Sequence, residues 1–139
     1  MNDFNAQVIA DFNAKGGKPG GYLGDDPVVL LHVIGAKSAQ ERTQPLMYLE
    51  GENETWYIFA SYAGRDNNPA WYHNLRANPE AAISIGDGTT IERVPVLARE
   101  LQGEQRDAIY AEMARRHQRF ADYQSKTDRK IPVIELTRR

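Results

Sequence analysis

Residues 81–100 read AAISIGDGTTIERVPVLARE and carry the clearest local signal in the chain. The pair Asp87-Gly88 stands between two runs in which apolar and polar side chains alternate. Such alternation gives a strand one buried and one exposed face, and Asp-Gly is typical of a two-residue hairpin turn. We therefore predict two antiparallel strands here, joined at Asp87-Gly88.

Further strands are predicted on both sides of this hairpin. Residues 27–34, PVVLLHVI, form a continuous apolar run, which indicates a central strand buried on both faces. PLMYLE (45–50) and TWYIFAS (55–61) flank GENE (51–54), which reads as a hairpin turn, and IPVIEL (131–136) is the last strand. About six mainly antiparallel strands at this spacing favour a small barrel.

An N-terminal helix is predicted over residues 3–15, stopped by Gly16-Gly17. Its apolar face consists of Phe4, Val8, Ile9 and Phe12. We expect this helix to cover the barrel core, and a helix lying on a membrane surface is the alternative. The Gly- and Pro-rich stretch GGKPGGYLGDDP (16–27) is predicted to be a loop.

Two to three peripheral helices are predicted between the later strands. NNPAWYHNLRANP (67–79) begins a helix with Asn68 as N-cap and Pro69 in the first helical position. Residues 103–120 form the next, and residues 120–130 continue it toward the last strand. One side of the helix over 103–120 carries Ile109, Tyr110, Met113, Ala114 and His117. This order of elements, with mostly hairpin connections, favours an α+β domain over a doubly wound parallel sheet.

Length and composition limit the classes of function. The 139 residues predict one domain over 1–139, and the net charge of −2 gives no basic excess for binding nucleic acid. The absence of Cys excludes disulfides, thiolate nucleophiles and cysteine zinc sites. No apolar run approaches the roughly 18–20 residues of a membrane span. The N-terminal stretch lacks the basic and apolar regions of a signal peptide, so we expect a cytoplasmic protein.

Familiar catalytic motifs are missing. Gly35-Ala36-Lys37-Ser38 lacks the spacing of a phosphate-binding P-loop, and no dinucleotide fingerprint or nucleophile elbow occurs. The three histidines, His32, His73 and His117, do not have metal-ligand spacing, so no metal site is predicted. His32 lies in an apolar run, where a hydrogen-bonded core or lining histidine is the expected role.

Two segments carry residues suited to an anionic or ring-shaped ligand. The loop GAKSAQERTQP (35–45) holds Lys37 and Arg42 among hydroxyl and amide groups, and it can bind a phosphate or carboxylate tail. A solvated hairpin loop is the alternative. The segment FASYAGRDNNPAWYHNLRANP (59–79) runs from a strand end into a Gly loop and a helix whose first N–H groups suit anions or ring carbonyls. Its aromatics Trp71 and Tyr72 either contact that ligand or belong to the core.

Residues 42–86, beginning RTQPLMYLE, and residues 120–136, FADYQSKTDRKIPVIEL, resemble the deazaflavin-dependent nitroreductase family of actinobacteria. The order and spacing fit from about Val28 to the C-terminus. The resemblance implies a split β-barrel that binds coenzyme F-420, an 8-hydroxy-5-deazaflavin with a phospholactyl-oligoglutamate tail. The cofactor-binding positions that it implies are Lys37, Ser38, Arg42, Gln44, Pro45, Leu46, Ala60, Ser61, Tyr62, Ala63, Gly64, Asn68, Pro69, Ala70, Trp71, Tyr72 and Asn74.

The resemblance further implies an enzyme that transfers a hydride from reduced deazaflavin to an electron-poor acceptor such as a quinone, an activated alkene or a nitroaromatic. The implied acceptor pocket holds Met47, His117, Phe120 and Tyr123. Ser61 is expected to hydrogen-bond the ring or the acceptor, and Tyr123 to orient the acceptor or relay a proton, with solvent as an equal candidate.

The chain departs from the family pattern in the tail loop and after Ser61. Ala39 stands where the family often has Gly, and Tyr62 where several members carry Lys, for which Arg65 could substitute. The alternative functions are a carrier that binds the deazaflavin or a fatty acyl chain without turnover, and an FMN-binding split barrel. The expected partners are a small-molecule acceptor and, at most, a second copy of the chain or peripheral contact with a membrane.

Overall fold

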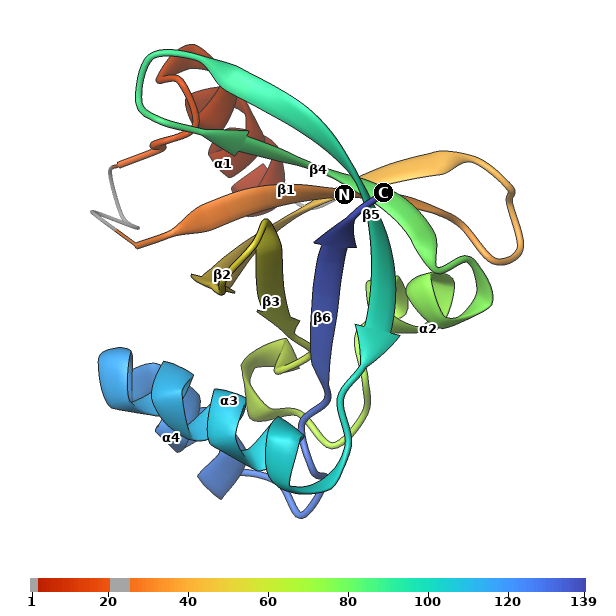
Figure 1. Ribbon diagram of the computed structural model, residues 1–139, viewed down its shortest axis with the longest axis vertical. Coiled ribbons are helices and arrows are strands. Elements are labelled where there is room, and N and C mark those ends of the chain that lie inside the picture. The colour runs from red at the N-terminus through yellow and green to blue at the C-terminus, as the bar shows by residue number, and fades with distance from the viewer. Residues whose placement is uncertain (1–2, 21–25) are drawn as a thin grey trace.

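Antiparallel strands close into a barrel in the computed structural model, which describes residues 3–20 and 26–139 (Figure 1). Around the barrel the strands follow the order β1-β2-β3-β6-β5-β4, and β4 pairs with β1 to close it. Their bounds are β1 Val28–Ile34, β2 Glu41–Glu50, β3 Thr55–Phe59, β4 Glu80–Gly86, β5 Ile91–Glu100 and β6 Val133–Arg138. The predicted α+β barrel of six antiparallel strands is thereby confirmed.

The barrel core is filled by the inward side chains of alternating strand positions. β1 contributes Val29, Leu31 and Val33, each at most 1% exposed, to the interior. Its outward Val28 and Leu30 pack on the N-terminal helix, so this strand is buried on both faces as predicted. The other strands contribute the fully buried Ile58, Ile83, Val94, Val96 and Leu136.

The N-terminal helix α1 (Asp3–Ala14) covers β1 through Val8 and Phe12. After it, the chain turns at Gly16 and Gly17, whose φ angles are +64° and +90°. Gly16 lies against the β4–β5 hairpin, because its carbonyl accepts a hydrogen bond of 2.9 Å from Gly88 N–H. A Cβ atom on Gly86 would lie 2.0 Å from that carbonyl, so only glycine fits there. The predicted helix stop is confirmed, whereas residues 21–25 of the predicted loop lie outside the described part.

The β4–β5 hairpin is confirmed, but its tip lies one residue later than predicted. Asp87 N–H donates to the carbonyl of Thr90 at 3.1 Å, which leaves Gly88 and Thr89 at the tip. The Asp87 carboxylate accepts the N–H groups of Thr90 and Thr89, each at 2.8 Å. These bonds lower the pKa of Asp87, and they explain the shift, because the side chain takes over part of the turn.

Three boundaries differ from the prediction. β2 begins at Glu41 and not at Pro45, because residues 41–44 also pair with β1. Helix α2 (Ala70–Ala77) has Pro69 as its N-cap, because the Asn68 side chain accepts a hydrogen bond from Arg129 instead of capping the helix. The predicted helix over 103–120 is two helices, α3 (Gly103–Arg116) and α4 (Gln118–Ser125). The break is at His117, whose extended backbone turns α4 back toward the barrel.

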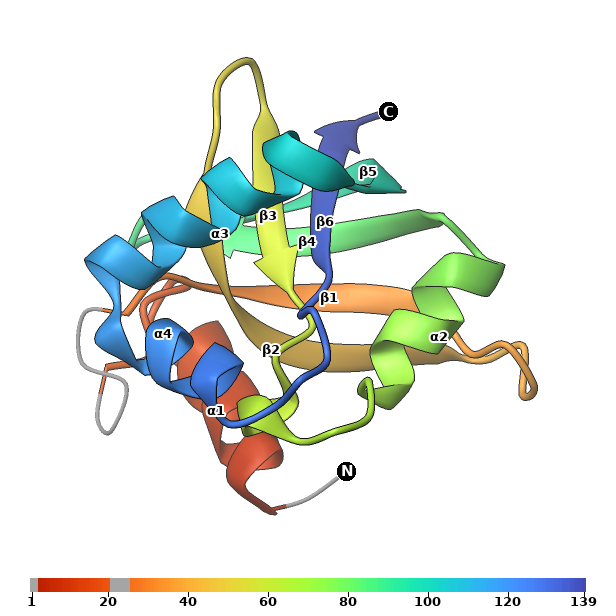
Figure 2. The same ribbon diagram turned by 90° about the horizontal axis from the view of Figure 1, so that it is seen from below.

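Helices α3 and α4 cover the outside of β3 and β6 through a second core cluster (Figure 2). It contains Leu49, Phe59, Leu101, Tyr110, Met113, Phe120, Ile131 and Val133. A short turn, η2 (Tyr62–Gly64), packs against α4. None of the described helices is long and apolar enough to cross a membrane.

Candidate active site

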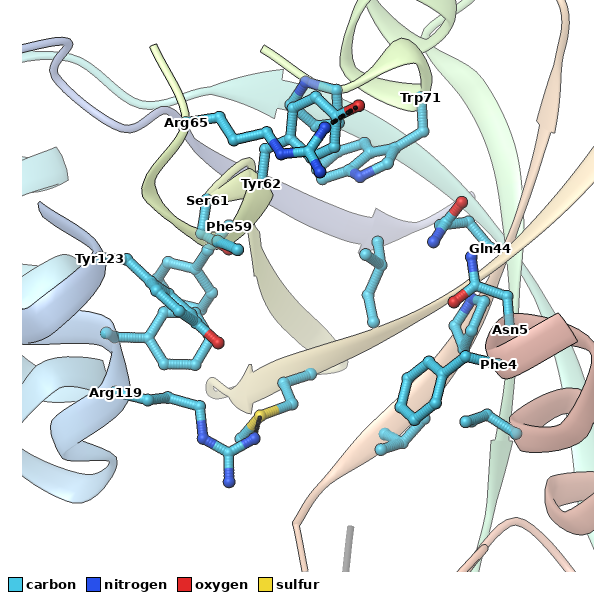
Figure 3. Close-up of a pocket in the computed structure, with 18 of the residues that line it drawn as sticks. Phe4, Asn5, Gln44, Phe59, Ser61, Tyr62, Arg65, Trp71, Arg119 and Tyr123 are labelled. Atoms are coloured by element: carbon cyan, nitrogen blue, oxygen red, sulfur yellow. Dashed lines mark hydrogen bonds between the residues drawn. The ribbon is translucent and has the colours of Figure 1, made fainter. Parts of the chain in front are cut away.

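A cleft of about 600 Å³ opens between α1, β2, η2, the start of α2 and α4 (Figure 3). Figure 3 shows Arg119 and Tyr123 of α4 facing Phe4 and Asn5 of α1 across this space, with Trp71 on a third side. The lining residues are Phe4, Asn5, Val8, Val28, Gln44, Pro45, Leu46, Met47, Phe59, Ser61, Tyr62, Ala63, Arg65, Pro69, Ala70, Trp71, Arg119, Phe120 and Tyr123. Its size is typical of a cofactor or small-molecule site.

The floor of the cleft is a strand with one open edge. β2 pairs with β1 as far as Met47, but it pairs with β3 only over residues 48–50. Residues 44–47 therefore have a strand neighbour on one side only, which is where a proline such as Pro45 is tolerated. The open edge leaves backbone N–H and C=O groups able to hydrogen-bond the polar rim of a flat ring.

One wall of the cleft is the turn that follows β3. Tyr62, Ala63 and Gly64 have φ angles of 46°, 54° and 78°, so two non-glycine residues adopt the left-handed conformation in succession. A Cβ atom on Gly64 would lie 2.7 Å from the backbone carbonyl of Tyr123, so the turn packs directly on α4. This contact joins the two walls of the cleft.

Arg129 holds this strained turn in place. Its guanidinium donates to the carbonyls of Ala60 (2.9 Å), Ser61 (3.0 Å) and Arg65 (2.9 and 3.1 Å), and to Asn68 Oδ1 (2.6 Å). Burial lowers the pKa of Arg129 from its ordinary value, and Asp66 partly offsets this effect. The segment Lys-Thr-Asp-Arg was noted in the sequence as part of the resemblance, but nothing in its local pattern indicates this clamp.

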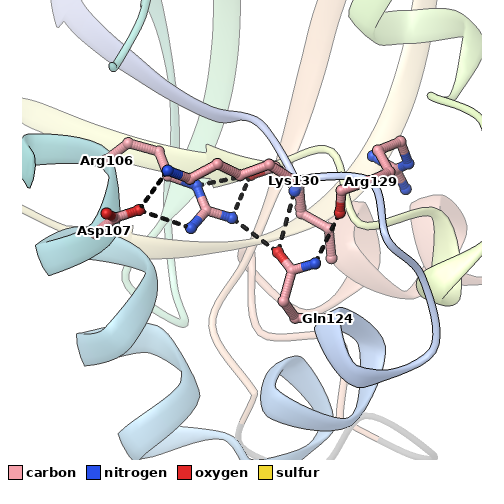
Figure 4. A network of polar contacts seen from close by, with 6 residues as sticks. Arg106, Asp107, Gln124, Arg129 and Lys130 are labelled. Atoms are coloured by element: carbon pink, nitrogen blue, oxygen red, sulfur yellow. Dashed lines mark hydrogen bonds and ion pairs between the residues drawn. The ribbon is translucent and has the colours of Figure 1, made fainter. Parts of the chain in front are cut away.

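A buried network anchors Arg129 in turn (Figure 4). Arg106 of α3 is 8% exposed and donates to the carbonyl of Ile131 at 2.7 and 3.0 Å and to Gln124 Oε1 at 2.9 Å. Gln124 Nε2 donates to the carbonyl of Arg129 at 2.7 Å. The connection between α4 and β6 is therefore fixed on both sides, with its backbone bound to α3 and α4 and its arginine bound to the cleft wall.

The other wall of the cleft is α4. Arg119 and Tyr123 are four residues apart, so they share one face of the helix. Phe120 lies between them and stacks edge-on against Tyr123 and Phe59, with ring centroids 5.3 and 5.5 Å apart. His117, which was predicted to lie in the acceptor pocket, stands at the helix break and does not line the cleft; its Nδ1 lies 4.0 Å from Asp26 Oδ1.

The structure brings many of the predicted site residues together in this cleft. These are Gln44, Pro45, Leu46, Met47, Ser61, Tyr62, Ala63, Pro69, Ala70, Trp71, Phe120 and Tyr123. Prediction from the sequence missed Phe4, Asn5, Val8, Val28, Phe59 and Arg119. The residues from α1 could not be found from local motifs, because only the fold places α1 opposite α4.

Other predicted positions lie around the cleft. Ala60, Gly64 and Asn68 support its wall through the clamp and the α4 contact described above. Tyr72 faces away, since its hydroxyl donates to Glu100 at 2.6 Å; burial and this hydrogen bond raise its pKa. Lys37, Ser38 and Arg42 are exposed on the β1–β2 hairpin, whose tip is tied to α2 by a hydrogen bond of 3.0 Å from Ala36 N–H to Asn74 Oδ1.

The electrostatics of the cleft favour an anion. Arg65 and Arg119 are its charged residues, and no Asp or Glu occurs among the described residues that line it. Arg119 is paired with Asp26 just outside the lining, so Arg65 and the remaining donors of Arg119 are the groups that could bind a negatively charged ligand. The flat open edge and the aromatic wall therefore fit a planar ring system, and the two cations fit negative charge on a bound ligand.

His32 lies outside the cleft. Its ring nitrogens contact Thr43 Oγ1 at 3.1 Å and Ser84 Oγ at 2.7 Å. Burial and then Arg93 lower the pKa of His32, with Glu41 opposing them. The predicted role as a hydrogen-bonded structural histidine is confirmed.

Comparison with known proteins assigns the chain to a family. A sequence profile described as F420H(2)-dependent quinone reductase matches residues 6–138. The chain belongs to this family. It is 40% identical over 121 residues to the F420H(2)-dependent quinone reductase Rv1261c of Mycobacterium tuberculosis, covering 84% of this chain and 76% of that protein.

Two solved structures agree with the family assignment. The F420-H2 dependent reductase FDR-A is 40% identical, with a TM-score of 0.69 over 79% of this chain and 93% of that one. A protein described as a domain-swapped dimer is 36% identical, with a TM-score of 0.71 over 94% of this chain and 92% of that one. The predicted deazaflavin family, the oxidoreductase class and the cofactor F-420 are confirmed.

Proposed function

We propose that this member of the F420H(2)-dependent quinone reductase family binds F-420 in the cleft and reduces a flat, electron-poor acceptor, with quinones as the first class. When bound, the reduced coenzyme supplies a hydride. The observation that supports this proposal is the cleft itself. It combines one open strand edge, an aromatic wall and two arginines, with no carboxylate among the described lining residues.

The protein's own groups divide the cleft into two ends. The backbone of residues 44–47 and the turn at Ser61 would hold the ring, with Trp71, which also belongs to the barrel core, at its side. Arg42 lies two residues beyond Gln44, which is about 7 Å along an extended strand. The anionic tail would therefore leave the cleft along β2 and meet Arg42 and Lys37 on the hairpin. Met47, Phe120 and Tyr123 remain for the acceptor at the opposite end.

The cofactor site can be tested by fluorescence titration. We expect the protein to bind F-420 with micromolar or better affinity and FMN much more weakly. Lys37→Ala and Arg42→Ala should each weaken F-420 binding by about 1–3 kcal/mol, the usual loss for a charged hydrogen-bond partner. The effect should shrink with a coenzyme that lacks the glutamates.

Arg99→Ala is the matched control, because Arg99 is an exposed arginine on β5 that pairs with Glu135 and does not line the cleft. FMN binding as tight as that of F-420 would contradict the proposed site. Unchanged F-420 binding in both hairpin variants would show that the hairpin is merely solvated.

Tyr123 is proposed to orient the acceptor or relay its proton. Tyr123→Phe keeps the ring that packs on Phe120 and removes only the hydroxyl. Turnover should fall about tenfold or more, equivalent to ~1.4 kcal/mol of transition-state stabilisation, with F-420 affinity unchanged. Tyr57→Phe on β3, outside the cleft, should behave like the parent. Full activity of Tyr123→Phe would leave solvent as the proton source.

The proposal also covers the oligomeric state and the location of the protein. Similarity to the domain-swapped dimer supports a homodimer for this chain. The cytoplasmic location stays a prediction. Peripheral contact with a membrane stays a prediction for α1, where Phe4 is 54% exposed at the edge of the cleft.

A further inference from the structure

We propose that Arg119 binds the carbonyl oxygen of the acceptor and stabilises the negative charge that forms on it during reduction. This inference rests on the proposed function and adds a residue that prediction from the sequence missed. Arg119 is the single cation on the α4 wall of the cleft among the described lining residues, next to Met47, Phe120 and Tyr123 (Figure 3).

The Arg119 guanidinium contacts two neighbouring side chains and still has free N–H donors. Its Nη2 lies 2.9 Å from Asp26 Oδ2, and its Nη1 donates to Met47 Sδ at 3.5 Å, a long and weak contact. The Asp26 side chain is 16% exposed and the Arg119 side chain 42%. A guanidinium carries five N–H donors in a rigid fork, so its ion pair with Asp26 leaves donors for an oxygen in the cleft.

The position of Arg119 favours the acceptor over the coenzyme tail. Arg119 contacts Met47, whereas the hairpin cation Arg42 lies five residues away along β2, about 17 Å in an extended strand. The tail leaves the cleft beyond Gln44, at the other end of the open edge. A cation beside Met47 therefore serves a different ligand group.

Reduction of a quinone or enone creates the charge that such a cation stabilises. The hydride leaves the C–H bond of the reduced coenzyme, which is thereby oxidised by two electrons, and forms a new C–H bond on the conjugated carbon of the acceptor. The electron pair of the broken π bond moves to the carbonyl oxygen, which becomes an enolate. A proton from Tyr123 or from solvent then neutralises this oxygen and completes the two-electron reduction. A guanidinium near this oxygen lowers the barrier, because the charge appears only as the reaction proceeds.

The test uses two probes with the same ring and different charge, which bind to the coenzyme-free protein without turnover. The 2-hydroxy derivative of 1,4-naphthoquinone is a vinylogous acid that is ionised at neutral pH and carries the enolate oxygen, whereas its methyl ether is neutral and has the same ring. Binding is followed by quenching of tryptophan fluorescence, since Trp71 lines the cleft. Arg119→Gln should weaken binding of the anion about tenfold or more and leave the methyl ether within about twofold. Arg119→Lys, which keeps the charge and loses the fork, should fall between the two.

Arg116→Gln is the matched control, because Arg116 is exposed on α3, pairs with Glu112 and does not line the cleft. The proposal would be overturned if Arg119→Gln lost affinity for both probes equally. It would also be overturned if Arg119→Gln bound both probes as tightly as the parent does. Loss of F-420 affinity by the same factor would overturn it too, since Arg119 would then serve the coenzyme. Failure of the parent to oxidise reduced F-420 with a neutral quinone would instead contradict the proposed function, while the probe comparison still reports on Arg119.

Discussion

Arg129→Met should loosen the turn after β3 and weaken F-420 binding by more than about tenfold, with a loss of about 2–4 kcal/mol in the free energy of unfolding. The reason is that one guanidinium satisfies three backbone carbonyls and the Asn68 side chain. Without it, these acceptors need water, and the left-handed conformations of Tyr62 and Ala63 lose their support. Titration with F-420 and thermal unfolding of the same samples measure the two effects.

Arg129→Lys separates charge from geometry. A lysine keeps the positive charge, but its single nitrogen cannot reach acceptors spread over residues 60–68, so only part of the binding should return. Lys130→Met is the control, because Lys130 is the next residue along and its exposed side chain pairs with Asp107 instead. F-420 affinity and unfolding midpoint equal to the parent's in Arg129→Met would contradict the clamp.

The strands could be predicted because each carries its pattern locally. The continuous apolar run of β1 reflects burial against the barrel interior on one side and α1 on the other. The β4–β5 hairpin could be predicted from the alternation of apolar and polar side chains on both sides of Asp87-Gly88. Its tip was misplaced by one residue, because the Asp87 side chain competes for N–H groups that a pure backbone turn would satisfy. Side-chain capping of this kind is not visible in hydrophobic periodicity.

The helix boundaries could not be predicted from the spacing of apolar residues alone. Residues 103–120 keep apolar side chains on one side, yet the chain breaks at His117. The break lets Phe120 pack on Phe59 while Arg119 and Tyr123 face the cleft. This tertiary packing, rather than any Gly or Pro, ends α3, so the sequence contains no stop signal at this point.

The two arginines with the largest proposed roles could not be found from sequence for a related reason. Arg119 and Arg129 stand in polar stretches that read as solvated surface. Their partners Asp26 and Ala60 are distant in the chain and are brought close only by the closed barrel. The motif resemblance included Arg129, but a motif match by itself assigns no contact.

Arg106→Met should lower the free energy of unfolding by about 3–5 kcal/mol, because it leaves the buried Ile131 carbonyl and the half-buried Gln124 without their charged partner. The substitution also removes the guanidinium that lies 4.6 Å from the centre of the Tyr110 ring. Tyr110 itself donates to the carbonyl of Phe120 at 2.6 Å, and burial raises its pKa to about 12. Loss of the Arg106 side chain should therefore also disturb α4 and lower the unfolding midpoint by roughly 10–20 °C.

The control for Arg106 is on the same helix. Arg115→Met removes an arginine whose side chain is 69% exposed and which pairs with Glu112, so it should cost less than about 1 kcal/mol. Because Gln124 links Arg106 to the backbone of Arg129, Arg106→Met should also weaken F-420 binding, though less than Arg129→Met does. A midpoint like the parent's in Arg106→Met would mean that water replaces the guanidinium and that the network does not support the cleft. A lowered midpoint with parental F-420 affinity would confine the network to stability and leave Arg129 as the sole link between the α4–β6 connection and the site.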